Sequence, residues 1–159
     1  MSKRDNSKKD QFLKSITAFT IEDVWADISC RCRFNFSYLD ITQQYSQDPS
    51  GWDEENLQKL FGKLKHYSSQ PLSYWQQQTV GSHKNHVLEV YGAFPRKSKF
   101  THPSHVPADV DWARFRLDGK KRFIGFMVPK GHCMFPNSFV ENTFYVVFLD
   151  PEHMFYLGK

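Results

Sequence analysis

The stretch "WARFRLDGKKRFIGFMV", residues 112–128, decides the fold of this chain. Two runs with the composition of β-strands, "WARFRL" (112–117) and "RFIGFMV" (122–128), flank the polar turn "DGKK" (118–121). A short polar turn that contains glycine between two such runs is typical of a β-hairpin. We therefore predict an antiparallel hairpin at this place.

The side chains of the first run separate into two faces, because successive residues of a strand point to opposite sides of the sheet. One face holds Ala113, Phe115 and Leu117, and the other holds Trp112, Arg114 and Arg116. The apolar face can pack against a helix, so we expect the arginines on the open face of the sheet. Arg122 begins the partner strand and should lie near them. Three converging guanidinium groups are typical of a site for phosphate oxygens; the alternative is surface charge that protects the sheet.

Further strands are predicted on both sides of the hairpin. The nearly apolar run "TFYVVFL" (143–149) predicts a central strand that is covered on both faces. The alternating run "CRCRFNFSYLDI" (30–41) predicts a half-buried strand, and "HVLEVYGAF" (86–94) another. Residues 95–110 contain three prolines and predict a loop. The short connections after residue 112 favour an antiparallel meander.

The clearest helix is "WDEENLQKLFGKLKHY" (52–67), with Asp53 as its predicted N-cap. Its apolar residues recur at the spacing of one helical face: Leu57, Leu60, Phe61 and Leu64. We expect that stripe to pack on the sheet. Thr20 is the predicted cap of a shorter helix that begins near Ile21, and "SSQPLSYWQQQ" (68–78) predicts another.

The composition predicts one domain. The chain has 159 residues, of which 40% are hydrophobic and 16% aromatic. Residues 1–11 are polar, charged and without periodicity, so we expect a disordered basic tail followed by a single α+β domain over residues 12–159. No apolar run reaches the roughly 18–20 residues that cross a bilayer, and the N-terminus lacks the apolar segment of a secretory signal. We expect a cytoplasmic protein with no membrane partner.

Positive charge is concentrated in one region. The net charge is +4, yet residues 96–122 hold eight Lys and Arg against three Asp, a surplus larger than that of the whole chain. The cations beyond the three arginines that we expect to contact nucleic acid are Lys97, Lys99, Lys120 and Lys121. Ordinary turn residues are the alternative for Lys120 and Lys121.

Metal chemistry has residues of the right type but no motif. The candidates are His83 with His86, His102 with His105, and His132 with Cys133. Zinc would require three or four of them to converge from separate loops, and the spacing of known motifs is missing. A glycine-rich phosphate loop and a G-x-S-x-G motif are missing from the sequence as well. We expect no metal and no cofactor, with a histidine-based metal hydrolase as the alternative.

The last third of the chain resembles the RelE/ParE toxin superfamily of bacterial toxin–antitoxin systems. The matching stretches are "RFRLDGKKRFIGFMV" (114–128) and "TFYVVFLDPEHMFY" (143–156). They reproduce the order of a basic strand, a glycine turn, Arg before an apolar strand, and a last apolar strand followed by a basic residue and a late Tyr. The resemblance implies an α+β fold with a twisted antiparallel sheet, N-terminal helices packed on one face, and a toxin-like meander at residues 112–156.

The resemblance also implies a function. RelE-type toxins cleave ribosome-bound mRNA without metal, by promoting attack of a ribose 2′-hydroxyl on the adjacent phosphate. By position, the implied catalytic residues are Arg114, Arg116, Arg122, His153 and Tyr156. His153 stands where the family has an arginine. The implied partners are RNA, including ribosome-bound mRNA, and an acidic antitoxin protein.

Two interpretations of the basic face therefore stand side by side. The first is a toxin-like, metal-independent endoribonuclease. The second is a non-enzymatic module that binds nucleic acid or protein through the same face. ParE-type relatives poison DNA gyrase with the same fold, so fold alone does not decide between the two.

Overall fold

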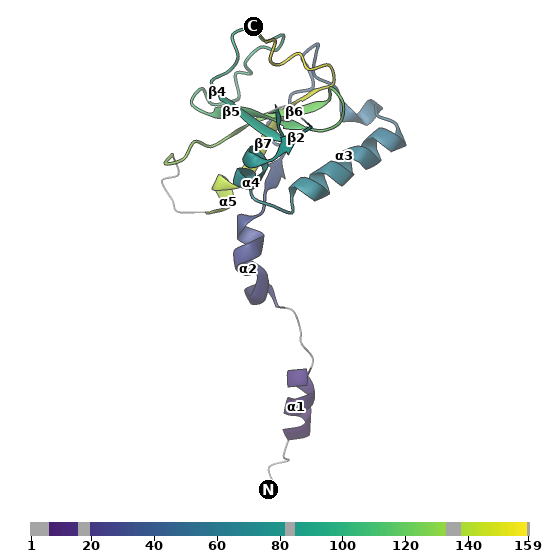
Figure 1. Cartoon of the computed structure of the whole chain (residues 1–159), viewed down its shortest axis with the longest axis vertical. Helices are drawn as coiled ribbons and strands as arrows, with labels where there is room; N and C mark the ends of the chain where they lie inside the picture. The colour runs from purple at the N-terminus through teal and green to yellow at the C-terminus, as the bar shows by residue number, and fades with distance from the viewer. Residues whose placement is uncertain (1–6, 16–19, 82–84, 133–137, 159) are drawn as a thin grey trace.

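A computed structural model of the chain describes residues 7–15, 20–81, 85–132 and 138–158 (Figure 1). The elements in chain order are α1 (Ser7–Ser15), α2 (Ile21–Cys30), β1 (Arg33–Asn35), the 3-10 turn η1 (Pro49–Gly51), α3 (Glu54–Tyr67), α4 (Leu72–Gln77), β2 (Thr79–Val80), β3 (Asn85–His86), β4 (Leu88–Gly92), β5 (Asp111–Arg116), β6 (Arg122–Met127), α5 (Ser138–Glu141) and β7 (Thr143–Asp150). These elements make an α+β fold, as predicted.

The main sheet has the strand order β1-β7-β6-β5-β4. Strands β5, β6 and β7 form the predicted antiparallel meander, β4 extends it as a further antiparallel strand, and β7 lies inside the sheet between β1 and β6. Strand β1 is parallel to β7, so the sheet is mixed rather than wholly antiparallel. A parallel pair needs a long crossover connection between its strands. Here the connection from β1 to β7 includes α3, α4 and the strands β2 to β6.

The predicted strand at 30–41 is mostly irregular, because only Arg33–Asn35 pair as β1. Beyond β1 the chain still follows β7, since the N–H of Asp40 donates to the carbonyl of Val147 and the N–H of Gln47 to that of Leu149, both at 2.8 Å. These bonds satisfy the outer edge of β7 without a regular strand.

Helices α2 and α3 start where the sequence predicts. Thr20 and Asp23 form a capping box at the start of α2. The carboxylate of Asp53 accepts from the N–H of Asn56 at 2.8 Å at the start of α3. In both cases a side-chain oxygen pairs with an N–H group that has no partner inside the helix.

One face of the sheet packs against α3 and α4. Ala113, Phe115 and Leu117 are buried on this side, as the alternation predicts. Tyr67 at the end of α3 stacks on Phe115 with ring centroids 4.8 Å apart, and its hydroxyl donates to the carbonyl of Arg116. The indole N–H of Trp75 in α4 donates to the carbonyl of Tyr67 at 2.7 Å. The two helices are thereby tied to each other and to β5.

The opposite face is not open, which corrects the expectation for the basic face. Residues 93–110 and the C-terminal segment (residues 151–158) cover it with aromatic side chains, including Phe100 and Phe155. Trp112 on this face is only 1% exposed and stacks on Phe148. The reason is hydrophobic burial: the aromatic residues of these two irregular segments need an apolar surface, and the sheet supplies it.

Asp150 holds the C-terminal segment in place. Its carboxylate is 1% exposed. It accepts from the N–H groups of Glu152, Met154 and Phe155 at 3.2, 2.9 and 2.8 Å. Three backbone donors satisfy a buried carboxylate that would otherwise be costly to desolvate. His153, inside this turn, has the left-handed φ of 63°.

The N-terminal region differs from the predicted disordered tail. Residues 7–11 belong to helix α1, none of whose residues is buried, and residues 1–6 lie outside the described part of the chain. In Figure 1, α1 lies furthest from the sheet and α2 lies between them. None of the helices within the described ranges is long and apolar enough to cross a membrane.

Candidate functional site

The three predicted arginines do converge. Arg116 lies directly opposite Arg122 in the β5–β6 register, and Arg114 is two positions back on β5. Burial lowers the pKa of Arg122 to about 10, and the positive charges of Arg116 and Arg114 contribute to that shift. Residues directly opposite each other in an antiparallel pair, and residues two apart on one strand, project from the same face of the sheet, so the three side chains are neighbours. We call these three residues the arginine cluster.

Two members of the arginine cluster are inaccessible, however. Arg114 is 6% exposed and Arg122 is 5% exposed. Arg114 forms an ion pair with Glu89 on β4. The Nη1 group of Arg122 donates to the carbonyl oxygens of Gly119 and Lys121, at 2.7 Å each. The expected open site for phosphate is therefore largely closed, because the C-terminal segment and residues 93–110 cover that face. The bonds within the cluster are incomplete, since the Nε of all three arginines and the Nη1 of Arg114 are buried without a hydrogen-bond partner among the described residues.

His153 lies beside the same cluster, and Tyr156 is linked to it through Tyr91. Burial lowers the pKa of His153, and the charges of Arg122 and Arg114 lower it further, which favours the neutral imidazole. Tyr156 stacks on Tyr91 with centroids 4.9 Å apart and planes 7° apart. Burial raises the pKa of Tyr91 to about 12, and the nearby charge of Arg114 opposes that rise. The structure thus groups the residues that the toxin resemblance implies, around a buried centre.

The four predicted lysines divide between two places. Lys97 and Lys99 are exposed and run beside the C-terminal segment: the carbonyl of Lys97 accepts from Leu157 at 3.3 Å, and the N–H of Lys99 donates to Met154 at 3.1 Å. Lys120 pairs with Glu152 at 3.5 Å on the surface. Lys121 points instead toward α3, on the other side of the sheet.

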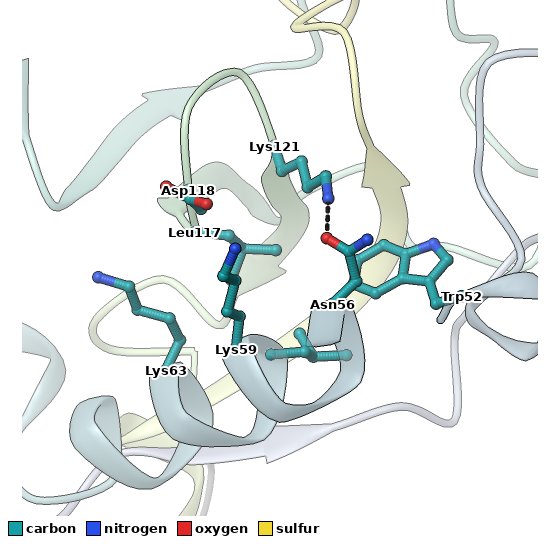
Figure 2. Close-up of a pocket in the computed structure, with 8 residues that line it drawn as sticks. Trp52, Asn56, Lys59, Lys63, Leu117, Asp118 and Lys121 are labelled. Carbon is teal, nitrogen blue, oxygen red and sulfur yellow. Dashed lines mark hydrogen bonds between the residues drawn. The ribbon is translucent and has the colours of Figure 1, made fainter. Parts of the chain in front are cut away.

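A groove between α3 and the β5–β6 turn collects further positive charge (Figure 2). Its lining includes Trp52, Asn56, Lys59, Lys63, His66, Arg116, Asp118 and Lys121. We call this the basic groove. Two adjoining hollows along it have volumes of about 380 and 330 Å³, while the hollow beside Trp52 and Lys121 is much smaller, about 10 Å³. Arg116, which is half-buried at the end of β5, belongs to both the arginine cluster and the basic groove. Unlike Arg114 and Arg122, Lys59 of the groove is exposed.

Local contacts hold the walls of the basic groove. Figure 2 shows Lys121 reaching across from the turn to donate to the side-chain carbonyl of Asn56. The Lys121 ammonium lies 5.1 Å from the ring centroid of Trp52, within the range of a cation–π contact. These contacts fix the hairpin turn against the first turns of α3.

The charge balance of the basic groove is positive. Lys59 pairs with Glu55 at 2.6 Å, and this bond raises the pKa of Lys59. Lys63 lies 5.8 Å from the ring of Tyr67. Asp118 in the lining and Glu55 beside Lys59 supply two carboxylates, against the four cations Lys59, Lys63, Lys121 and Arg116. A concave surface with this excess attracts anions.

The lysines on the α3 side of this groove were not predicted from the sequence as site residues. The helix has an apolar stripe and a mixed charged face. This is the pattern of an ordinary surface helix and does not by itself indicate a binding site. The available signal was the spacing of Lys59 and Lys63, since residues four apart lie on the same helical face. Their meeting with Lys121 depends on the tertiary fold.

The described histidines form no metal site. Within residues 7–15, 20–81, 85–132 and 138–158, no group of three or more His, Cys, Asp or Glu is placed to hold a metal ion. His102 contacts the carbonyl of Pro103 at 2.9 Å, and His105 that of Tyr38 at 3.1 Å. His83 and Cys133 lie outside the described ranges.

No protein-family model, curated protein or solved structure matches the chain. The likeness to RelE/ParE toxins therefore rests on the sequence pattern alone.

Proposed function

We propose that the protein binds single-stranded RNA through the basic groove. The observation that carries this proposal is a row of cations along adjoining hollows: Lys59, Lys63 and Lys121 line the hollow beside the ring of Trp52, and Lys63 and Arg116 line the hollow at the other end. A positive groove with an aromatic side chain is the usual arrangement for a single strand, whose phosphates meet the cations while its bases stack. Lysines one helical turn apart, about 5.4 Å along the axis, can contact neighbouring phosphates.

The salt dependence of binding tests the groove. A fluorescently labelled RNA dodecamer is titrated with protein at several salt concentrations, and Kd is read from anisotropy. Each lost phosphate contact reduces the slope of log K against log salt by about 0.7 for a single strand. We expect the Lys59→Ala/Lys63→Ala variant to bind more weakly, with a slope reduced by about 1.4.

The matched control is Lys65→Ala, which removes an exposed lysine of the same helix that does not line the groove. It should keep the wild-type slope. Equal affinity and equal slope in wild type and the double variant would show that RNA does not bind in the basic groove. Tighter binding of polyglutamate than of RNA at equal charge would instead favour an acidic protein as the partner.

Metal-independent RNA cleavage of the toxin type is a second candidate function. The observation that favours it is the position of His153, in the turn held by the Asp150 carboxylate, with Asp150 directly opposite Arg122 in the β6–β7 register. Burial and the charges of Arg122 and Arg114 lower the pKa of His153, which favours its neutral form. Such an imidazole can accept the proton of a 2′-hydroxyl while guanidinium groups stabilise charge on the phosphoryl oxygens. Because both arginines are buried, a phosphate reaches them only when the C-terminal segment moves. A cytoplasmic location, ribosome-bound mRNA as substrate and an acidic antitoxin belong to this candidate.

Cleavage is tested by adding the protein to a translation extract and mapping transcript ends. Loss of one group that stabilises the transition state slows such reactions by roughly a hundredfold, so Arg122→Ala should be nearly inactive. His153→Asn provides a second variant that leaves the buried arginines in place. Intact transcripts with wild-type protein would rule out this candidate and leave the binding proposal standing.

A further inference from the structure

An exposed aromatic ring lies on the other side of the sheet from the basic groove. Tyr156 is 43% exposed, although one of its faces is covered by Tyr91 at 4.9 Å and a plane angle of 7°. Tyr91 is itself packed against Phe155, 5.9 Å away, and lies beside the buried Arg114. The pair is therefore a two-ring stack with a supported inner ring and an accessible outer ring.

The outer ring forms one wall of a small cleft. Pro95, Arg96, Lys97 and Leu157 line the rest of it, and its volume is about 190 Å³. That is less than the roughly 300–1,000 Å³ of pockets that enclose a drug-sized ligand. The cleft can take one planar ring system and leaves the rest of a larger ligand at its rim.

Two cations stand at this rim. Arg96 and Lys97 are both exposed, and neither has a carboxylate within ion-pair distance among the described residues. The hydrogen bond from the N–H of Leu157 to the carbonyl of Lys97, 3.3 Å long, joins the two sides of the cleft. The backbone that carries the cations is therefore kept at a fixed place relative to the ring of Tyr156.

We propose that Tyr156 is a stacking subsite for one unpaired nucleobase, with Arg96 and Lys97 binding the phosphate of the same nucleotide. A tyrosine face binds any base through stacking, and the adjacent cations select ligands that carry phosphate. The ligand is either a free nucleotide or an unpaired nucleotide of a strand. This subsite goes beyond the basic groove, because none of its residues lines that groove.

NMR titration of the full chain tests the subsite residue by residue. The probes are adenosine 5′-monophosphate, adenosine, and an RNA hexamer of adenylates. We expect amide shifts at Tyr156 and Leu157, with weaker binding of adenosine than of the monophosphate. Replacing Tyr156 by Ala should weaken monophosphate binding roughly tenfold, while Tyr156→Phe should bind within about twofold of wild type because the ring is kept.

Further variants separate stacking on the Tyr156 ring from attraction to positive charge. Tyr74→Ala is the matched control, since Tyr74 is 40% exposed but lies on α4. Arg96→Ala/Lys97→Ala should bring the affinity for the monophosphate down to that for adenosine. Shifts with the monophosphate support a site for free nucleotides, and shifts with the hexamer alone support a site on a strand. The proposal would be overturned if neither the monophosphate nor the hexamer shifts these amides, or if wild type and Tyr156→Ala bind with equal affinity. Neither result depends on binding in the basic groove.

Discussion

Glu89 of β4 and Arg114 of β5 lie directly opposite each other and form an ion pair in which one partner is buried and the other is partly exposed. The side chain of Arg114 is 7% exposed and that of Glu89 is 37% exposed. The charge of the arginine is therefore balanced within the protein. Arg114 has the chemistry of a phosphate ligand, but it is buried and already paired with a carboxylate.

Removing the carboxylate should destabilise the fold. Glu89→Gln leaves the Arg114 charge buried without its counter-charge, and we expect a loss of about 2 kcal/mol in the free energy of unfolding. Urea denaturation followed by circular dichroism measures it. The double variant Glu89→Leu/Arg114→Met should regain most of this loss, because it removes both charges. A single variant as stable as wild type, with higher RNA affinity, would show that Arg114 is free to bind ligand.

Gly125 of β6 should tolerate no side chain. A Cβ at this position would lie 2.0 Å from the carbonyl oxygen of Tyr145 and 2.8 Å from a ring carbon of Phe144. A backbone atom cannot move aside, so we expect Gly125→Ala to cost about 3 kcal/mol or more. The matched control is Gly62→Ala in α3, where nothing lies within 4 Å of the new Cβ. This control should stabilise the protein by about 0.5–1 kcal/mol. Equal unfolding midpoints for the two variants would contradict the packing of β6 against β7.

Acid should destabilise the protein partly through His153. Burial and the charges of Arg122 and Arg114 lower its pKa in the folded state below the 6.5 of an unperturbed histidine. The unfolded chain therefore takes up this proton first as the pH falls. The stability that the group contributes is complete above pH 6.5 and is lost as the pH falls through the lower folded pKa.

The matching variant is His153→Asn, because asparagine tolerates the left-handed φ of 63° and does not titrate. Between about pH 7.5 and 5.5, on either side of the ordinary histidine pKa, we expect wild type to lose more stability than this variant. Chemical denaturation at each pH measures the difference. Parallel pH profiles for the two proteins would mean that the imidazole is not held beside the arginine cluster.

The two described cysteines should differ in reactivity. Burial raises the pKa of Cys32 to about 12, and its side chain is 2% exposed. On the order of one Cys32 thiol in ten thousand is then a thiolate at pH 8. Cys30 is exposed at the end of α2. We expect iodoacetamide to modify Cys30 in the native protein and Cys32 only after denaturation, as read by peptide mass spectrometry. Equal labelling of both in the native state would contradict the burial of Cys32.

The hairpin at residues 112–128 was predictable because its information is local. The pleat of a strand places Phe115 on the opposite face from Trp112 and Arg114 whatever the rest of the chain does. The caps at Thr20 and Asp53 are local in the same sense, since each bonds an N–H three residues away. The β1–β7 pairing was not predictable, because it joins residues more than 100 positions apart and β1 is only three residues long.

The sequence by itself determined the α+β class, the meander, and which residues of β5 face the helices, because strand and helix periodicity are properties of neighbouring residues. Only the tertiary structure decided which cations are accessible. Residues 93–110 and 151–158 have no periodicity that indicates their position, yet their aromatic side chains cover the second face and bury Arg114 and Arg122. The same folding brings Lys59 and Lys63 to Lys121, about sixty residues further along the chain. Burial and convergence are long-range properties, so the basic groove exists only once the core is packed.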